Sequence, residues 1–361
     1  TIQHGFDLLL QKIMTMQYNI PTITYISIVT LSLLVTFMQI ETVSGSVGDN
    51  SQPFIECLAT CRTRLCGISD IKYENKLPFY MRWLKWNCVD DCKYQCMWPT
   101  VEFFKDRGWP IPQFHGKWPF TRCYGIQEPA SVVFSILNAI TLIYNLWWYR
   151  KKVEDKAPLY NIVHVGNVVS VNAWVWSSVF HTRDTRITEM LDYFCAISLV
   201  IYSVFMLACR VFGTERPLKA SICGLILFYF FVWHVHYLAY VKFDYGYNIK
   251  ATVSVGVLNS IGWLIWCAVV RKRQPYVWKC ALSIVLLNLL ILLEVGDFPP
   301  IWWVFDAHSL WHAGTVPLPF IWYSFLIDDC NYLLKEKQQR KEQSIDATSS
   351  QTAEEVIKKI S

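Results

Sequence analysis

Charged residues are scarce in this chain. Only 17% of its 361 residues are Asp, Glu, Lys or Arg, well below the roughly 25% that is usual for soluble domains. The formal net charge is +5, and the basic residues lie in short loops and a C-terminal tail rather than on one face, which argues against nucleic-acid binding. Hydrophobic residues make up 53% of the chain and the mean hydropathy is +0.26, so the composition indicates a membrane protein.

Several familiar patterns are also missing. The sequence has no internal repeat, no Asn-x-Ser/Thr acceptor site for glycosylation, no G-x-S-x-G and no H-E-x-x-H. The last two absences exclude the local signatures of the α/β-hydrolases and of the common zinc proteases. Any hydrolytic site must therefore be assembled from residues that lie far apart in the sequence.

The first 45 residues read as a leader. Met16 is a natural start, an apolar run covers about 26–40, and small residues end at Gly45. This order predicts a secretory signal peptide cleaved near Gly45, and the alternative is an uncleaved membrane helix. Residues 1–15 have no evident role.

Clustered cysteines mark the next segment, 46–126. Six of the thirteen cysteines form a C-x3-C-x4-C and a C-x3-C-x3-C cluster: Cys57, Cys61, Cys66, Cys88, Cys92 and Cys96. After a signal peptide such clusters predict disulfides rather than a zinc knuckle. Fifteen pairings are possible. We favour the nested one (57–96, 61–92, 66–88), because near-helical spacing places each cluster on one helical face. Cys123 is left over and is expected to be free.

The remainder, 127–330, predicts a bundle of seven transmembrane helices, so the fold class is an all-α membrane protein with an N-terminal disulfide-rich lumenal subdomain. The seven apolar stretches lie near 127–148, 162–181, 190–212, 218–240, 250–270, 276–296 and 304–326.

Basic residues follow the first, third, fifth and seventh stretches, which predicts a lumenal N-terminus and a cytosolic C-terminus. The tail, 331–361, is polar, charged and too poor in apolar residues to fold alone. Lys358 and Lys359 stand at the third and fourth positions from the end. This resembles a dilysine signal read by the coat-protein retrieval machinery and favours the endoplasmic reticulum, the Golgi membrane or both, but a random basic end would look the same.

Five polar residues are predicted to lie at the lumenal ends of these helices. Ser177 and His181 share a helix face at i, i+4, as do His308 and His312, and Asp192 opens the third helix. Three imidazoles with one position left for water are typical of a catalytic Zn²⁺ site. In such a site Asp192 would accept the proton of the water, and Ser177 would donate a hydrogen bond to the oxyanion.

Asp306 stands next to this group, and we expect it to hold a ligand imidazole by a hydrogen bond. A membrane histidine alone is more often an interhelical hydrogen-bonding group than a ligand, and H-x3-H alone is a weak motif. The metal hypothesis rests on the combination of Ser177-x3-His181, Asp192 and His308-x3-His312. A serine hydrolase that used Ser177 and His181 would leave the pair on the last helix unexplained.

Longer strings carry a family resemblance. They include DDCKYQCMWPT (90–100), QEPASVVF (127–134), NAWVWSSVFHTRDT (172–185) and DFPPIWWVFDAHSLWH (297–312). With the Ser-x3-His, Asp and His-x3-His pattern, the chain resembles the CREST superfamily of seven-helix membrane hydrolases. Within it, 51–337 is similar to the phospholipases A2 that act on GPI anchors after their attachment to proteins.

The resemblance implies fatty-acid remodelling of GPI anchors, in which the sn-2 fatty acid is removed from the lipid of GPI-anchored proteins. It also implies Zn²⁺ at His181, His308 and His312, with Asp192 and Ser177 in catalytic roles. Two alternatives stay open at this point. One is an amidase similar to the alkaline ceramidases, and the other is a non-enzymatic seven-helix lipid receptor.

Overall fold

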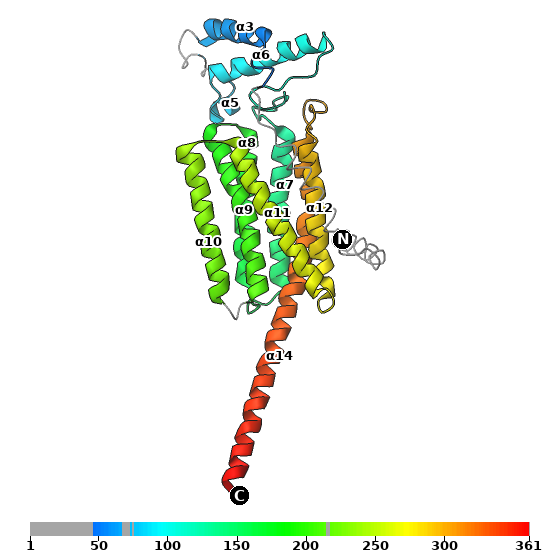
Figure 1. Ribbon diagram of the computed structural model, residues 1–361. Helices are drawn as coiled ribbons and strands as arrows, with labels where there is room; N and C mark the ends of the chain where they lie inside the picture. The colour runs from blue at the N-terminus through cyan, green and yellow to red at the C-terminus, as the bar shows by residue number, and fades with distance from the viewer. Residues whose placement is uncertain (1–45, 67–72, 74–75, 214–216, 361) are drawn as a thin grey trace.

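The computed structural model describes residues 46–66, 73, 76–213 and 217–360, and the expected leader lies outside them. The described part is helical, and its only β contacts are isolated bridges. Figure 1 shows a small layer of helices lying across one end of a bundle of long helices.

The N-terminal layer is cross-linked by disulfides. Its helices α3 (Gln52–Cys61) and α6 (Cys88–Lys105) pack side by side, with the π-helix η2 (Arg62–Cys66) after α3 and the short α5 (Phe79–Trp83) before α6. Three bonds join them in the nested order: Cys57–Cys96, Cys61–Cys92 and Cys66–Cys88. A bridge of this kind typically adds about 2–4 kcal/mol to stability, so the layer needs only a small apolar core.

The bundle supplies the rest of the described chain. Its helices are α7 (Pro129–Lys152), α8 (Tyr160–Thr182), α9 (Arg186–Phe212), α10 (Pro217–His236), α11 (Tyr245–Val270), α12 (Trp278–Val295), α13 (Ala307–Thr315) and α14 (Leu318–Ile360). Two short segments join them, the π-helix η3 (Tyr237–Val241) and the 3₁₀ helix η4 (Pro275–Val277).

Five segments of the described chain are long and apolar enough to cross a membrane: 129–152, 186–212, 217–241, 245–270 and 275–294. The predicted count of seven is therefore not confirmed. α8 is not among the five, because it carries several Asn, Ser and His side chains. The last expected stretch, 304–326, is divided into α13 and α14 around Pro317. Proline lacks the backbone N–H that a continuous helix would use.

Polar side chains fasten these two regions to their neighbours. Asn138 of α7 donates to the carbonyl of His312 in α13 at 2.9 Å. Asn167 of α8 donates to the carbonyl of Leu142 at 2.9 Å and to the hydroxyl of Tyr323 at 2.6 Å. Such interhelical hydrogen bonds are the usual polar contacts of membrane bundles, and here they hold α8 and α13 beside α7.

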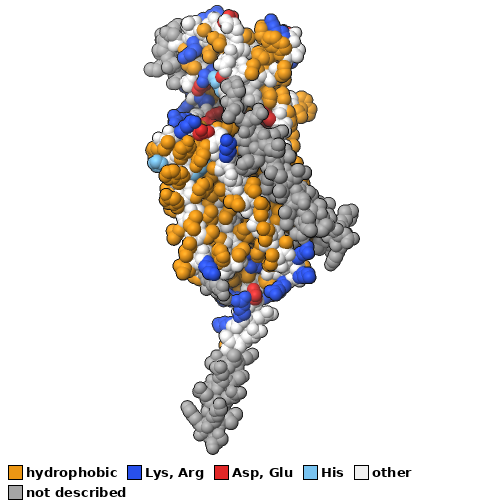
Figure 2. Space-filling view, in the orientation of Figure 1, with side chains coloured by type: hydrophobic (Ala, Val, Ile, Leu, Met, Phe, Trp, Pro, Cys, Tyr) orange, Lys and Arg blue, Asp and Glu red, His pale blue; other side chains and the backbone are white. Residues whose placement is uncertain are grey.

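The two ends of the bundle differ in charge. Figure 2 shows Lys and Arg gathered at the end far from the N-terminal layer, with hydrophobic side chains covering the length between. α14 leaves the bundle at that basic end and continues to Ile360 (Figure 1). The domain boundary expected at residue 330 therefore falls inside one helix.

Candidate active site

Three imidazoles converge at the end of the bundle that faces the N-terminal layer. The Nε2 atom of His308 lies 3.3 Å from Nε2 of His181 and 2.9 Å from Nε2 of His312. The ligand atoms of the three residues all lie within 4.8 Å of one another. The side chain of His181 is 3% exposed and that of His308 is 34% exposed, so the cluster opens to its surroundings on the His308 side.

Helix ends place these side chains. His181 stands in the last turn of α8, and Thr185 caps the next helix, α9, after a short turn. Asp306 caps α13 by accepting from the backbone N–H of Ser309 at 2.8 Å. This cap fixes the start of α13, so that His308 and His312, four residues apart, present their rings on one face.

The other ring nitrogen of each histidine has its own partner. Nδ1 of His181 lies 2.7 Å from Oε2 of Glu128, and Nδ1 of His308 lies 2.8 Å from Oε2 of Glu294. Nδ1 of His312 lies 2.8 Å from Oγ of Ser135. A carboxylate accepts the Nδ1 proton, which fixes the tautomer and leaves the Nε2 lone pair available. The carboxylates fix this tautomer for His181 and His308, and the three Nε2 atoms face one another on the side away from the Nδ1 partners.

This donor set fits Zn²⁺. Tetrahedral zinc with bonds of about 2.0–2.1 Å separates its nitrogen ligands by roughly 3.4 Å. The Nε2–Nε2 distances of 2.9 and 3.3 Å are close to that spacing. Without a shared proton or a cation, such convergent lone pairs would repel, so the arrangement is suited to hold a metal ion.

A buried ion pair lies on the Nδ1 side of His181. Glu128 precedes α7 and also accepts from Nζ of Lys117 at 2.5 Å, while Lys117 pairs with Asp184 at 3.1 Å. Burial by itself raises the pKa of Glu128, but Lys117 and His181 outweigh it and hold the pKa well below its usual range. Glu128 therefore carries the negative charge that a buried cationic site needs.

The two proposed catalytic side chains lie beside this cluster. Oγ of Ser177 lies 3.1 Å from Oγ of Ser135, which in turn contacts His312. Asp192 lies within electrostatic range of His181 and His308. Among the described residues its carboxylate makes no hydrogen bond and no ion pair, so it is available to a water or a substrate.

Asp306 does not have the contact that the sequence suggested. Its hydrogen bonds within the described chain are those of the α13 cap, not a bond to an imidazole. Its contribution is to set the start of α13. The imidazole partners are Glu128, Glu294 and Ser135 instead.

A model of the Per1-like family matches residues 78–330. The chain belongs to the Per1-like family. It is 45% identical over 296 residues to a Danio rerio protein named GPI-specific phospholipase A2-like PGAP3, a match that covers 82% of this chain and 94% of that protein. The human protein of the same name is 43% identical over 298 residues, covering 82% of this chain and 93% of its own length.

A Drosophila melanogaster protein named Post-GPI attachment to proteins factor 3 is 40% identical over 288 residues. That match covers 77% of this chain and 87% of the fly protein. No solved structure matches the chain. Both helices that carry the imidazoles, α8 and α13, lie inside the Per1-like match, and so do Glu128, Ser135 and Glu294.

Sequence reasoning missed the three imidazole partners of this Per1-like protein. Glu128 is 53 residues from His181, and Ser135 is 177 residues from His312. No spacing pattern can link residues so far apart. One signal was available: Glu128 and Glu294 are carboxylates at the ends of apolar stretches, where an ionisable side chain is expensive and usually functional.

Proposed function

We propose that this Per1-like protein is a multi-pass membrane hydrolase that removes the sn-2 fatty acid from the lipid of GPI-anchored proteins. The observation that carries the proposal is the convergence of three imidazole groups, two of them buried, at one end of an apolar bundle. The names of the zebrafish and human relatives, GPI-specific phospholipase A2-like, support the substrate. The reaction would be the hydrolysis of a carboxylic ester.

In this proposal His181, His308 and His312 hold one Zn²⁺. When bound, zinc supplies a Lewis acid and lowers the pKa of a nearby water to about 7. Glu128, Glu294 and Ser135 keep the three rings in the required tautomer. Asp192, whose carboxylate is unpaired, accepts a proton from the attacking water and can pass it to the leaving alcohol.

The serines form a directed hydrogen-bond chain. If Nε2 of His312 is a ligand, its Nδ1 carries the proton and donates to Ser135. Ser135 then donates its own hydroxyl proton to Oγ of Ser177, across 3.1 Å. Ser177 is left with a free O–H donor, which is what an oxyanion that develops on the substrate carbonyl requires.

We further propose that α8 and the α13–α14 pair complete seven membrane crossings. α8 packs between α7 and α9, and α13 packs against α7 and α12. The basic end of the bundle would then be cytosolic and the disulfide layer lumenal. The leader (1–45), lumenal segment (46–126), hydrolase bundle (127–330) and cytosolic tail (331–361) fit this topology, with residence in the endoplasmic reticulum or Golgi membrane.

The decisive experiment is hydrolysis of a diacyl GPI lipid by the purified full-length protein in detergent. We expect release of the sn-2 fatty acid, loss of release after chelation, and recovery when Zn²⁺ is restored. His308→Ala should lose metal and activity together. His164→Ala is the matched control, because His164 contacts the carbonyl of Tyr160 within its own helix, outside the cluster.

Three results would contradict the proposal. Release that survives complete removal of metal would exclude the metal mechanism. Full metal occupancy in His308→Ala would exclude this cluster as the metal site. Hydrolysis of a ceramide amide in place of the GPI ester would assign the protein to the amidase class, and binding without turnover would assign it to the receptors.

A further inference from the structure

The proposed ester hydrolysis leaves one question open: what makes such an enzyme select a GPI lipid. An sn-2 acyl ester is common to many glycerophospholipids, so contacts to the ester cannot discriminate among them. Selectivity must come from the part of the lipid that differs, which is the phosphorylated sugar head group. A site for that group must lie within a few bonds of the three imidazoles.

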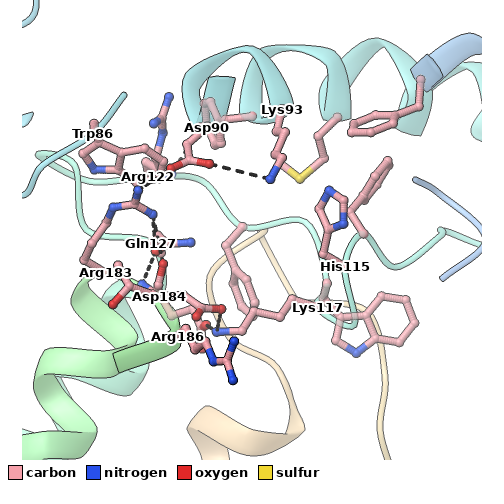
Figure 3. Close-up of a pocket in the computed structure, with 18 residues that line it drawn as sticks. Trp86, Asp90, Lys93, His115, Lys117, Arg122, Gln127, Arg183, Asp184 and Arg186 are labelled. Carbon is pink, nitrogen blue, oxygen red and sulfur yellow. Dashed lines mark hydrogen bonds and ion pairs between the residues drawn. The ribbon is translucent and has the colours of Figure 1, made fainter. Parts of the chain in front are cut away.

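The structure contains a cavity of about 320 Å³ in this position, between the N-terminal layer and the bundle (Figure 3). Its walls come from α6, from the segment that precedes α7, and from the turn between α8 and α9. Its volume is in the range of sites for small molecules. Glu128 and Lys117 belong to its wall, and Glu128 also contacts His181.

The cavity shares its framework with the imidazole cluster. The backbone N–H of Gln127 donates to the carbonyl of Thr182, and that of Glu128 donates to the carbonyl of His181, both at 3.1 Å. These two bonds fasten the start of α7 to the end of α8. Gln127, Glu128 and Arg183 all line the cavity, and Glu128 also holds His181.

Positive charge exceeds negative charge around this cavity. Three carboxylates line it against five cationic side chains, which are Lys93, Lys117, Arg122, Arg183 and Arg186. Figure 3 shows Lys93 reaching into it from the side of α6 and Arg186 lying on the side of the bundle. The other four cations pair with carboxylates, whereas Arg186 has no ion pair within the described chain, so its charge is the one that the protein leaves uncompensated.

The guanidinium groups also hold unused donors. Nη1 of Arg122 and Nε of Arg183 are buried and have no hydrogen-bond partner among the described residues. The two groups lie over the ring of Trp86, at 4.3 and 4.0 Å from its centroid. Each guanidinium has one carboxylate partner, Asp91 for Arg122 and Asp90 for Arg183. The unused donors keep their desolvation penalty, which an anion bound in the cavity would remove by accepting from them.

We propose that this cavity binds the phosphoinositol head group of the GPI lipid. Arginine and lysine are the usual partners of a phosphate, and the carboxylates and Gln127 can accept hydrogen bonds from sugar hydroxyls. Trp118 supplies an aromatic face for a sugar ring, whereas Trp86 and Tyr94 carry the guanidinium groups on their rings. The inference rests on the proposed function and explains its selectivity, since a head group seated here leaves the acyl ester close to His181.

Binding of a head group without acyl chains tests this apart from hydrolysis. Glycerophosphoinositol would be titrated calorimetrically into the full-length protein in detergent. We expect binding in the wild type and at least tenfold weaker binding in the double variant Lys93→Gln/Arg186→Gln. Arg82→Gln is the matched control, because Arg82 is an exposed cation of the same layer that does not line the cavity. It should bind as the wild type does.

Two further ligands identify the source of the anion. Inorganic phosphate and glycerophosphocholine should both bind at least tenfold more weakly than glycerophosphoinositol. Equal binding of inorganic phosphate would overturn the head-group assignment, as would no binding by the wild type or unchanged binding in the double variant. A protein that binds glycerophosphoinositol but hydrolyses no ester would keep this inference and lose the proposed reaction. A protein that hydrolyses the ester but does not bind glycerophosphoinositol would keep the proposed reaction and lose this inference.

Discussion

Removing the carboxylate behind His308 should weaken zinc binding without disturbing the fold. Oε2 of Glu294 lies 2.8 Å from Nδ1 of His308, and its side chain is 46% exposed. Loss of such a partner usually weakens metal binding by about 10–100-fold. Because water can replace a half-exposed carboxylate, we expect the lower end for Glu294→Ala, about tenfold, or about 1.4 kcal/mol.

Two further variants test how the loss of zinc affinity depends on charge and exposure. Glu294→Gln keeps an oxygen that accepts from Nδ1–H but loses the charge, so its zinc affinity should lie between those of wild type and Glu294→Ala. At Glu128, only 6% exposed, water cannot replace the carboxylate, and Glu128→Ala should approach the hundredfold end of the range. The order of the four affinities follows from exposure and charge alone.

Zinc affinity would be measured by competition with a chromophoric chelator in detergent, with thermal unfolding as a check on folding. Glu102→Ala is the control, because Glu102 is also a carboxylate in an ion pair, 3.1 Å from Nζ of Lys105, but belongs to the N-terminal layer. Wild-type affinity in Glu294→Ala would refute the role of Glu294. Weaker binding in Glu294→Gln than in Glu294→Ala would refute the reasoning from charge.

Three further outcomes are expected. Asp192→Asn should keep its zinc, measured by elemental analysis, but lose about 10²–10⁴-fold in kcat, because an amide accepts no proton. Ser177→Ala should cost about 10²–10³-fold, and adding Ser135→Ala should cost little more in a double-mutant cycle, since both serines act in one chain. Burial raises the pKa of Asp91, but hydrogen bonds from Tyr73 and Arg122 outweigh it and lower the pKa below its ordinary value. The stability that this carboxylate contributes is thus present above about pH 4 and lost as pH falls further, so the difference in Tm between wild type and Asp91→Asn should shrink below about pH 4.

The spacing of residues along single helices was enough to predict two parts of the molecule, the disulfides and the histidine pair of α13. The nested disulfides follow from cysteines that recur near the helical period, and His308 with His312 follows from the same period on α13. The meeting of His181 with that pair was predicted from topology, because the end of α8 and the start of α13 lie at the same end of the bundle. Each of these inferences needs only the position of a residue along a helix.

The predicted count of seven spans exceeds the five segments of the described chain that are long and apolar enough, and the reason is physical. α8 carries Ser177, His181 and other polar side chains that make it less apolar, and α13 has only 9 residues. Glu128, Ser135 and the cavity beside them could not be predicted, since their contacts join residues that only the folded bundle brings together.

The separation of the histidines along the chain has a consequence for biogenesis. His181 and His308 are 127 residues apart, and the helices between them must be in place before the imidazoles can meet. In the proposed mechanism, zinc is therefore loaded onto a finished chain rather than a growing one. A chain truncated before α13 would keep the disulfide layer and most of the bundle but only one of the three ligands. Such a product would pass a test for folding of the N-terminal layer and still be unable to acquire its metal.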